Sequence, residues 1–424
     1  MSAEASLDRA RRLDASDPLR EFAREFALPR GADGKPLVYL CGHSLGPLPL
    51  AAREVVAAEL DDWARLGVTG HESARRPWIT YAEQLRGGLE ALCGARPGEA
   101  VAMNSLTINL HLMLASFYRP AGRRTKILIE SGAFPSDRHA VASQIAWHGL
   151  DPHDHLIELA APPGSSLIET GSIEETLRAR GEEIALVLWP GVQYLTGQAF
   201  DLAAISSAAR RAGAIAGFDL AHAIGNLPLA LHDAGADFAV WCSYKYLNGG
   251  PGAIGGCFVH ERHGTDPAVP RLAGWWGHEA ATRFKMSPEF RPARGAEGWQ
   301  VSNPPILSSA PLLASLEIFQ RAGIERLRAK SIALTDFMER SLRPLPITLV
   351  TPGEASARGC QLSIRVGATA ARGRAIFAAL QAGGIVCDWR EPDVIRAAPA
   401  PLYNGFEDAL RFAERLAEAL RAVS

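Results

Sequence analysis

The chain has 424 residues, 47% of them hydrophobic and 21% charged, which is typical of an ordinary folded globular protein. This length is too great for one compact core and predicts about two domains. The formal net charge of −2, without a strongly basic block, argues against a nucleic-acid-binding surface. No apolar run is long enough to span a bilayer, and the N-terminus lacks the apolar segment of a secretory signal. A cytoplasmic protein without membrane association is expected.

The cysteines favour a reducing compartment. All six are scattered without a Cys-x-x-Cys pair, and several lie in apolar runs, so buried reduced thiols are expected. Residues 151–155, Asp-Pro-His-Asp-His, resemble a metal cluster, but no further ligands follow at a suitable spacing. We predict a polar loop there and no metal site.

The N-terminal part of the chain is predicted to be mainly helical. Residues 16–26 indicate a capped amphipathic helix with a proline near its first turn. A short strand at 36–40 leads to a glycine-bounded turn that contains Ser44. A long helix follows over 49–66, then an irregular polar loop over 71–78.

From Val101 the pattern changes to alternating short strands and helices, which predicts a parallel or mixed sheet. Residues 104–109 open a helix, where free backbone N–H groups and the Thr107 hydroxyl form a candidate phosphate site. An ordinary helix N-cap is the alternative. A strand over 126–130 leads to a loop with Phe134, which either stacks on a cofactor ring or packs in the core.

A helical capping box and a βαβ unit follow. Residues 172–175 match the capping-box pattern. A strand is predicted over 184–189, and Asp201 is predicted to cap a helix that Gly213 ends.

Two buried strands deliver the most informative side chains. One covers 214–218 and leads to Asp219, with His222 one turn further; the other covers 238–242 and leads to Lys245, between two tyrosines in a glycine-rich segment. Pyridoxal phosphate chemistry needs a lysine to bind the cofactor and an anion to keep its pyridine nitrogen protonated. Strand ends in an open α/β sheet bring such groups together. Taken singly, Asp219 could be a helix N-cap and Lys245 a solvated surface group.

Two loops near residue 300 have unusual compositions. Residues 275–279 are rich in aromatic side chains, and residues 301–305 include Asn303 between a serine and two prolines. Indole and amide N–H groups in loops are useful hydrogen-bond donors. Packing in an interface is the alternative, and both roles are compatible.

A smaller C-terminal domain is predicted to begin with a long helix after Pro311. Strands are expected over 359–366 and 384–387, and a terminal amphipathic helix over 410–423. Arg396 lies between a strand and a proline-rich loop, which suits bidentate capture of a carboxylate. A surface salt bridge is the alternative.

Taken together, these motifs resemble kynureninase. The segments that carry the resemblance are FDLAHAIGN, WCSYKYLNGGPG, FPSD, WWGHE, RFKM, SNPP, RGCQLSI and IRAAPAPLYN, between about Leu37 and about Phe406. The resemblance implies the aspartate-aminotransferase-like (type I) α/β fold of pyridoxal phosphate enzymes, with a large domain around a mainly parallel sheet and a smaller α+β domain. We expect an N-terminal segment over 1–48 that packs with the small domain, the large domain over 49–310 and the small domain over 311–424.

The resemblance also implies an activity. Kynureninases are cytoplasmic homodimers that hydrolyse L-kynurenine or 3-hydroxykynurenine to anthranilate or 3-hydroxyanthranilate plus L-alanine, in tryptophan degradation and NAD biosynthesis. His71 with Ser302 and Asn303 resembles the members that favour the 3-hydroxy substrate, because polar side chains can meet a ring hydroxyl. A preference for 3-hydroxykynurenine is therefore expected.

Roles are carried over only where a motif matches. Lys245 is expected to bind the cofactor and move protons, with Tyr244 as a proton relay and Asp219 as partner of the ring nitrogen. The other implied contacts are Leu106, Thr107, Tyr244 and Trp275 toward the phosphate end, Phe134, Pro135, Ser136, Asp137, His222 and Asn303 toward the cofactor, and Ser44, His71, Asn303 and Arg396 toward the substrate. Trp275 is implied to come from the partner subunit. Pro190, where some relatives have a serine, cannot donate a hydrogen bond, which puts that contact in doubt.

Three alternatives remain open from the sequence. An aminotransferase would leave the amino form of the cofactor, and a cysteine desulfurase needs an exposed loop cysteine, whereas Cys360 precedes an apparent strand. A non-catalytic relative is disfavoured because Lys245, Asp219 and Arg396 are all present. Visible absorbance of a covalently bound cofactor, lost in Lys245→Ala, would discriminate.

Overall fold

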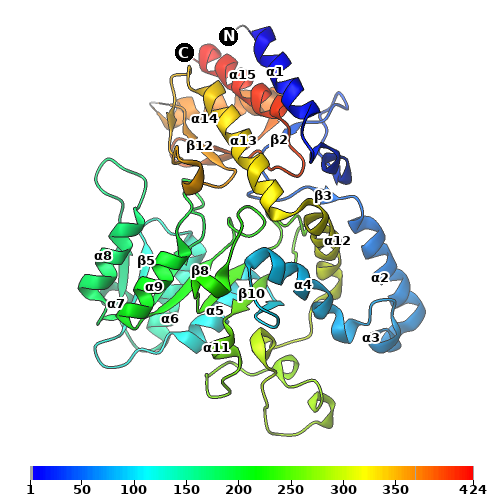
Figure 1. The fold of residues 1–424 in the computed structure, drawn as a ribbon, viewed down its shortest axis with the longest axis vertical. Coiled ribbons are helices and arrows are strands. Elements are labelled where there is room, and N and C mark those ends of the chain that lie inside the picture. Colours follow the sequence, from blue (N-terminus) through cyan, green and yellow to red (C-terminus); the bar gives the residue numbers. More distant parts are fainter. Residues whose placement is uncertain (1–2, 368, 424) are drawn as a thin grey trace.

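The computed structural model describes residues 3–367 and 369–423, and it shows a large lobe and a smaller lobe that contains both chain ends (Figure 1). No helix of the described part is long and apolar enough to cross a membrane.

The large lobe is built on a seven-stranded sheet of order β4-β10-β9-β8-β7-β5-β6. Its strands are β4 (Ala100–Ala102), β5 (Lys126–Glu130), β6 (Leu156–Leu159), β7 (Ile184–Pro190), β8 (Ile215–Asp219), β9 (Phe238–Trp241) and β10 (Gly256–Val259). The five strands from β9 to β6 run parallel, whereas β10 is antiparallel to both β9 and β4. All parallel strands therefore end at one edge of the sheet, where ligands bind in open α/β folds.

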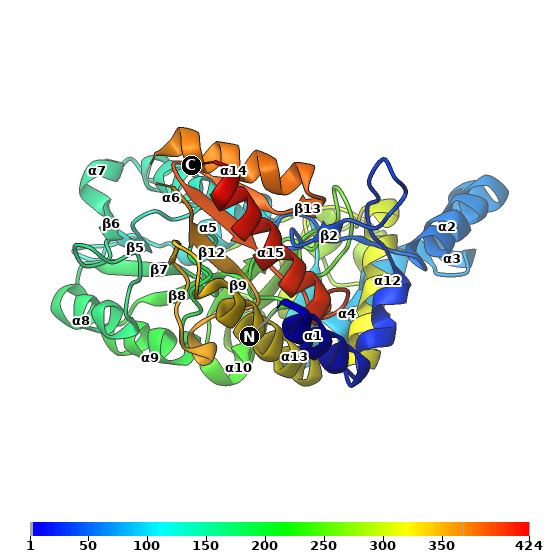
Figure 2. The same ribbon diagram turned by 90° about the horizontal axis from the view of Figure 1, so that it is seen from above.

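Helices cover both faces of this sheet, because its strands are apolar on both sides. One core contains α5 (Leu106–Phe117) and α6 (Pro135–Trp147). The opposite core contains α4 (Tyr81–Cys93), α8 (Thr170–Arg180), α9 (Leu202–Ala212) and α12 (Ile306–Ala322). Beyond α12, the long helix α2 (Ala52–Leu66) extends to one side and continues into α3 (Gly70–Ser73) (Figures 1 and 2).

The small lobe has a four-stranded antiparallel sheet of order β11-β12-β15-β14. These strands are β11 (Thr348–Leu349), β12 (Leu362–Arg365), β14 (Asp388–Arg390) and β15 (Val394–Ala397), packed with α13 (Ile324–Leu342), α14 (Ala370–Ala382) and α15 (Phe406–Ala422). The N-terminal helix α1 (Ala3–Ala15) lies against α15, and Asp14 accepts the backbone N–H groups of Phe406 (2.7 Å) and Glu407 (3.0 Å). A parallel pair joins β2 (Val38–Tyr39) to β13 (Ile385–Val386).

Short elements complete the chain. They are β1 (Phe26–Ala27) paired with β3 (Leu48–Pro49), α7 (Pro152–His155), α10 (Leu231–Ala234) and α11 (Glu261–Gly264).

The change from one hydrophobic core to the other occurs along α13. Helix α12 contributes Leu312 and Phe319 to the core of the large sheet, and Leu327 in α13 still belongs to it. Leu334, further along α13, belongs to the core of the small lobe. We therefore propose that the domain division falls within α13, rather than at residue 311.

Several predicted elements are corrected by the structure. Residues 20–25 form a short 3-10 helix rather than part of an amphipathic helix, and residues 152–155 form the short helix α7 rather than an irregular loop. The predicted capping box is wrong, because the helix N-cap is Glu169 and residues 172–175 already lie inside α8. Pro311 lies within α12 instead of preceding it, although proline cannot donate a backbone hydrogen bond there. Its neighbours Ala310 and Leu312 are buried.

Candidate active site

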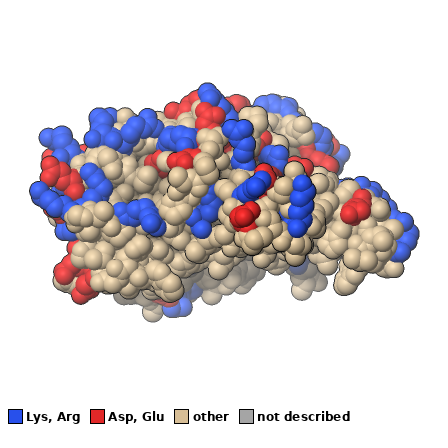
Figure 3. All heavy atoms as spheres, turned by 90° about the horizontal axis from the view of Figure 1, so that it is seen from below, with Lys and Arg blue, Asp and Glu red and all other residues tan. Residues whose placement is uncertain are grey.

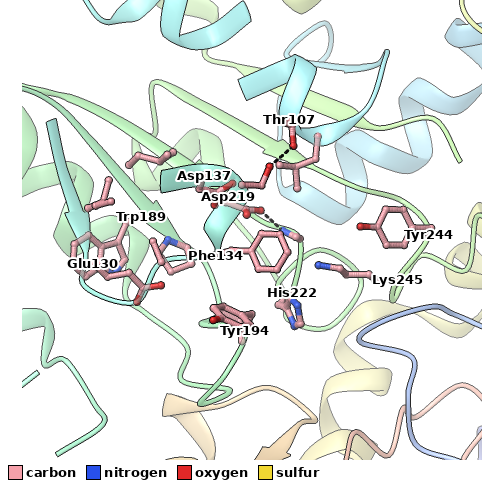
Figure 4. A pocket seen from close by; sticks show the side chains of 18 residues that line it. Thr107, Glu130, Phe134, Asp137, Trp189, Tyr194, Asp219, His222, Tyr244 and Lys245 are labelled. Atoms are coloured by element: carbon pink, nitrogen blue, oxygen red, sulfur yellow. Dashed lines mark hydrogen bonds between the residues drawn. The ribbon is translucent and has the colours of Figure 1, made fainter. Parts of the chain in front are cut away.

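A cavity opens at the edge of the large sheet where the parallel strands end. Its walls come from the ends of β5, β7 and β8, the first turns of α5 and α6, and the segment that follows β9 (Figure 4). Nine of the predicted site residues line it: Leu106, Thr107, Phe134, Ser136, Asp137, Asp219, His222, Tyr244 and Lys245. They come from four separate stretches of the chain, which only the sheet topology brings together.

Lys245 reaches the cavity from a tight turn after β9. The backbone N–H of Asn248 bonds the Lys245 carbonyl (2.9 Å), and that of Gly249 bonds the Ser243 carbonyl (2.8 Å). The Nζ atom lies 5.8 Å from the centroid of the Phe134 ring and 5.9 Å from that of Tyr244. The amine is therefore held between two aromatic rings at the cavity wall.

Asp219 is the last residue of β8 and is largely buried. One of its oxygens accepts the Ala221 backbone N–H at 2.7 Å. The carboxyl group of Asp137, in the first turn of α6, is its close neighbour (Figure 4), and Asp137 Oδ1 has no hydrogen-bond partner among the described residues. An unpartnered buried carboxyl oxygen is costly unless a ligand supplies a donor.

Glu130, at the end of β5, adds a third acidic group to the cavity lining. Burial raises the pKa of Glu130 to about 8, and nearby Asp219 also raises it. Burial raises the pKa of Asp137 well above its usual range, and so does the adjacent Asp219 carboxylate. Lys245 is the one cationic side chain among the lining residues that the structure describes. This excess of acidic groups suits a ligand that carries positive charge into the cavity.

His222 also lines the cavity. Burial lowers the pKa of its imidazole well below the usual value, and the positive charge of Lys245 lowers it further. The ring is therefore neutral at physiological pH, and it can lie against a ligand ring without adding charge.

Two helix N-termini meet at one end of the cavity. Leu106 and Thr107 open α5, and the N-cap Ser105 makes no side-chain capping bond. The Thr107 hydroxyl lies 2.7 Å from that of Ser136 in the first turn of α6, which begins at Pro135. Unpaired backbone N–H groups and paired hydroxyls form an anion site suited to phosphate.

Arg396 lies in β15 of the small lobe and does not line the cavity directly. Its side chain is buried, which excludes the predicted alternative of a surface salt bridge. Nη1 donates to the Tyr194 carbonyl (2.6 Å) and Nη2 to the Asp388 carboxylate (2.6 Å). Tyr194 does line the cavity, and its ring packs edge-on against Phe134 at 5.3 Å, so the guanidinium lies one residue behind the cavity wall.

Ser44 lies in the turn that precedes α2, beside the lysine segment. The backbone N–H of Gly46 donates to the Tyr244 carbonyl at 2.8 Å, so this turn is attached to the wall of the cavity. Its neighbour His43 is fully buried, and neither ring nitrogen has a hydrogen-bond partner among the described residues.

Besides Ser44, Pro135 and Arg396, three predicted site residues lie outside the cavity lining. Trp275 is 47% exposed, and its indole N–H donates to the Arg283 carbonyl (3.1 Å). Asn303 is exposed in its loop, and His71 lies on α3 with its ring 5.5 Å from that of Trp78. Figure 1 shows α3 at the outer edge of the large lobe. Within one protomer, these side chains do not join the cavity.

Sequence reasoning missed Glu130, Trp189 and Tyr194 among the lining residues. Glu130 and Trp189 occupy strand ends at the same sheet edge as Asp219, which is the signal that could have found them. Pro190, the last residue of β7, also lines the cavity and offers it no N–H donor.

The residues present fit pyridoxal phosphate. One cavity holds the four features that this cofactor needs. They are an amine, a pair of carboxyl groups for a protonated ring nitrogen, an aromatic side chain for the ring face and a binding site for the phosphate.

Comparisons with known proteins agree with this chemistry. A family model described as the kynureninase C-terminal domain matches residues 327–416. A protein named kynureninase from Xanthomonas euvesicatoria pv. vesicatoria is 56% identical over 407 residues, covering 95% of this chain and 96% of the relative. A protein of the same name from Xanthomonas campestris pv. campestris is 54% identical over 419 residues, covering 98% of both chains.

Solved structures share the fold at low identity. The cystine C–S lyase C-DES, in complex with its product cysteine persulfide, has a TM-score of 0.76 at 22% identity and covers 90% of this chain and 97% of its own. The cysteine desulfurase CsdA from Escherichia coli has a TM-score of 0.76 at 18% identity, covering 95% and 98%. The chain therefore has the type I fold of pyridoxal phosphate enzymes.

Proposed function

This chain belongs to the kynureninase family, and we propose how its residues hydrolyse L-kynurenine or 3-hydroxykynurenine to an aminobenzoate and L-alanine with pyridoxal phosphate. One observation supports the assignment of roles above the others. Lys245 and Asp219 follow adjacent parallel strands and open into the same cavity, with a phosphate-binding pair of helix N-termini beside them.

The bound cofactor supplies an electron sink that makes the substrate Cα proton acidic and the Cβ–Cγ bond cleavable. Lys245 anchors the cofactor and then moves the proton at Cα, since its amine is held at the cavity wall. Asp219 keeps the ring nitrogen protonated, with Asp137 beside it. Phe134 and His222 hold the ring faces, and Leu106, Thr107, Pro135 and Ser136 bind the phosphate.

Tyr244 and Arg396 act on the substrate. Tyr244 lies within reach of Lys245, and burial raises the pKa of its phenol, so it stays protonated and can donate to the ketone that water attacks. Arg396 binds the α-carboxylate, for which its guanidinium is oriented by Asp388 and the Tyr194 carbonyl. Ser44 contacts the aromatic ring of the substrate.

We infer that the site is completed by a second subunit in a cytoplasmic homodimer. His71, Trp275 and Asn303 are displayed outward, away from their own cavity. Exposed apolar side chains accompany them on and after α2, where Leu60, Trp63 and Val68 are 44%, 60% and 79% exposed. A partner that covers this face would bring polar groups to the aryl end of the neighbouring cavity.

A cysteine desulfurase role is disfavoured by the position of Cys360. The thiol is fully buried, and burial raises its pKa to about 12, so it is neither accessible nor ionised. A cysteine desulfurase would need an exposed thiolate to accept the sulfur atom.

The preference for 3-hydroxykynurenine is tested by the ratio of the two kcat/KM values, measured for the wild type and for His71→Ala. We expect the wild type to favour the 3-hydroxy substrate and His71→Ala to lose most of that preference, because a polar partner of the ring hydroxyl has been removed. A ratio near one in the wild type, unchanged in the variant, would contradict the preference.

A further inference from the structure

A single buried amide connects the cofactor wall to the substrate-binding arginine. Gln193 follows β7 at the start of a tight turn that continues to Gln198, and it is 7% exposed. Its Nε2 donates to Glu130 Oε1 (3.4 Å) and to the Gly132 carbonyl (3.3 Å). Its Oε1 accepts the backbone N–H groups of Leu195 (2.6 Å) and Thr196 (2.8 Å). All four hydrogen-bonding positions of the amide are therefore used.

The nitrogen of this amide holds the part of the cavity wall formed by Glu130 and the loop before Phe134. Glu130 lines the cavity, and Gly132 precedes Phe134 in the short connection between β5 and α6. Gln193 thus links the strand end to the loop that carries the ring-stacking side chain. Gly132 has a φ of +81°, so the connection depends on an unusual backbone conformation that this bond helps to hold.

The oxygen side determines where the Tyr194 carbonyl points. By accepting two successive N–H groups, it fixes the turn that contains Tyr194 and Leu195. The Tyr194 carbonyl accepts Arg396 Nη1 (2.6 Å) and Gln361 Nε2 (3.0 Å), so the turn is also the contact with the small lobe. A change in the turn would displace the guanidinium from the α-carboxylate.

We propose that Gln193 is a positioning residue that couples cofactor binding to recognition of the substrate α-carboxylate. Gln193 itself is not among the residues that line the cavity. It sets the Gly132–Phe134 wall with one end of its amide and the Tyr194–Arg396 contact with the other. The second half of this role rests on the proposed function, because it assumes that Arg396 binds the carboxylate of L-kynurenine.

Gln193→Met removes all four bonds while keeping a side chain of similar length. We expect the KM for L-kynurenine to rise on the order of tenfold, with a smaller change in kcat, because the turn that carries the Tyr194 carbonyl loses two of its hydrogen bonds. The dissociation constant of pyridoxal 5′-phosphate should rise together with the KM. The visible circular dichroism of the bound cofactor should also change, because the ring wall has moved.

Gln198→Met is the matched control. Gln198 belongs to the same turn and also uses both ends of its amide, but its Nε2 and Oε1 bond the Ile168 backbone (2.6 and 3.1 Å), away from Glu130, Gly132 and Arg396. Both variants should lose some thermal stability. Only Gln193→Met should change KM, cofactor affinity and circular dichroism.

Gln193→Glu separates the two ends and protects the test against a variant that fails to fold. It keeps the acceptor for Leu195 and Thr196 but loses the donors to Glu130 and Gly132, so cofactor affinity should fall more than KM rises. Wild-type values for all three properties in both Gln193 variants would overturn the proposal. If the wild type forms no L-alanine from L-kynurenine, the proposed function fails, while cofactor affinity and circular dichroism still decide the role of Gln193.

Discussion

Asp219 and Lys245 differ in how firmly the surrounding residues fix them. Lys245 is placed by the turn after β9, whereas Asp219 is placed by β8 itself and by one backbone N–H, with Asp137 and Glu130 close by. The sequence predicted both residues, since each follows a recognisable buried strand. It did not predict Glu130 as part of the same cluster, although Glu130 also ends a predicted strand, because which strand ends meet depends on the order of the strands in the sheet.

Asp219→Ala should lower kcat by on the order of a hundredfold or more, because the ring nitrogen loses the charge that keeps it protonated. The fold should persist, since removal of one of three neighbouring carboxyl groups relieves repulsion. Steady-state kinetics and the melting temperature of the same preparation check both parts. Turnover near that of the wild type would contradict the role given to Asp219.

Glu130→Gln should change how stability depends on pH. Burial raises the pKa of Glu130 from 4.5 to about 8, so its protonated form stabilises the fold fully below about pH 4.5, and this contribution is lost as pH rises toward 8. The amide cannot ionise, so the cofactor-free variant should lose less stability than the wild type between pH 5 and pH 8. Urea unfolding of both cofactor-free proteins at the two pH values tests this. If the free energy of unfolding changed equally with pH in the two proteins, the raised pKa of Glu130 would be contradicted.

At the scale of elements, residue patterns located most strands and helices but not what each helix face contacts. β5 lies where it was predicted, and Asp201 caps α9 by accepting the Ala204 N–H (3.0 Å), as predicted. By contrast, in α2, within the long helix predicted over 49–66, the apolar Trp63 and Leu60 are exposed while Glu59 and Asp62 are buried. Periodicity shows that a helix is amphipathic, but not that its apolar side meets its own chain.

Gly217, two residues before Asp219 in β8, is required by close packing. A Cβ at this position would lie 2.1 Å from the Phe238 ring, so Gly217→Ala should destabilise the protein by about 1–3 kcal/mol and lower turnover by displacing the strand end. Gly171→Ala in α8 is the control, because nothing lies within 4 Å of its added Cβ and alanine favours helix. Unfolding in urea should separate the two variants. Equal stabilities would show that β8 tolerates the extra methyl group.

At the scale of the whole molecule, residue patterns alone did not show which site residues belong to one protomer. Nine of them line one cavity, while His71, Trp275 and Asn303 do not. Periodicity and spacing describe one chain, so a contribution from a second subunit came only from the family resemblance. On the face shown in Figure 3, charged side chains gather over the upper part, where basic ones predominate and acidic ones lie among them, and the lower part is largely uncharged.

Trp63→Glu should weaken the proposed homodimer, because it places a charge on the exposed apolar side of α2. Activity should fall with the dimer and recover at high protein concentration, where association is restored. Trp147→Glu, which changes an even more exposed tryptophan at the end of α6, is the control and should leave both properties unchanged. Sedimentation velocity and specific activity, measured for both variants across a dilution series, show whether activity follows dimer formation. A monomeric Trp63→Glu variant with full activity would refute a shared site.

The most direct test of the whole account is the stoichiometry of the reaction. The purified protein, loaded with pyridoxal 5′-phosphate, would be incubated separately with L-kynurenine and 3-hydroxykynurenine, and the aminobenzoate and L-alanine would be measured together. Equal amounts of both products over many turnovers are expected, since hydrolysis releases one of each per bond cleaved. Absence of L-alanine, with the cofactor converted to pyridoxamine phosphate, would contradict hydrolysis and indicate an aminotransferase.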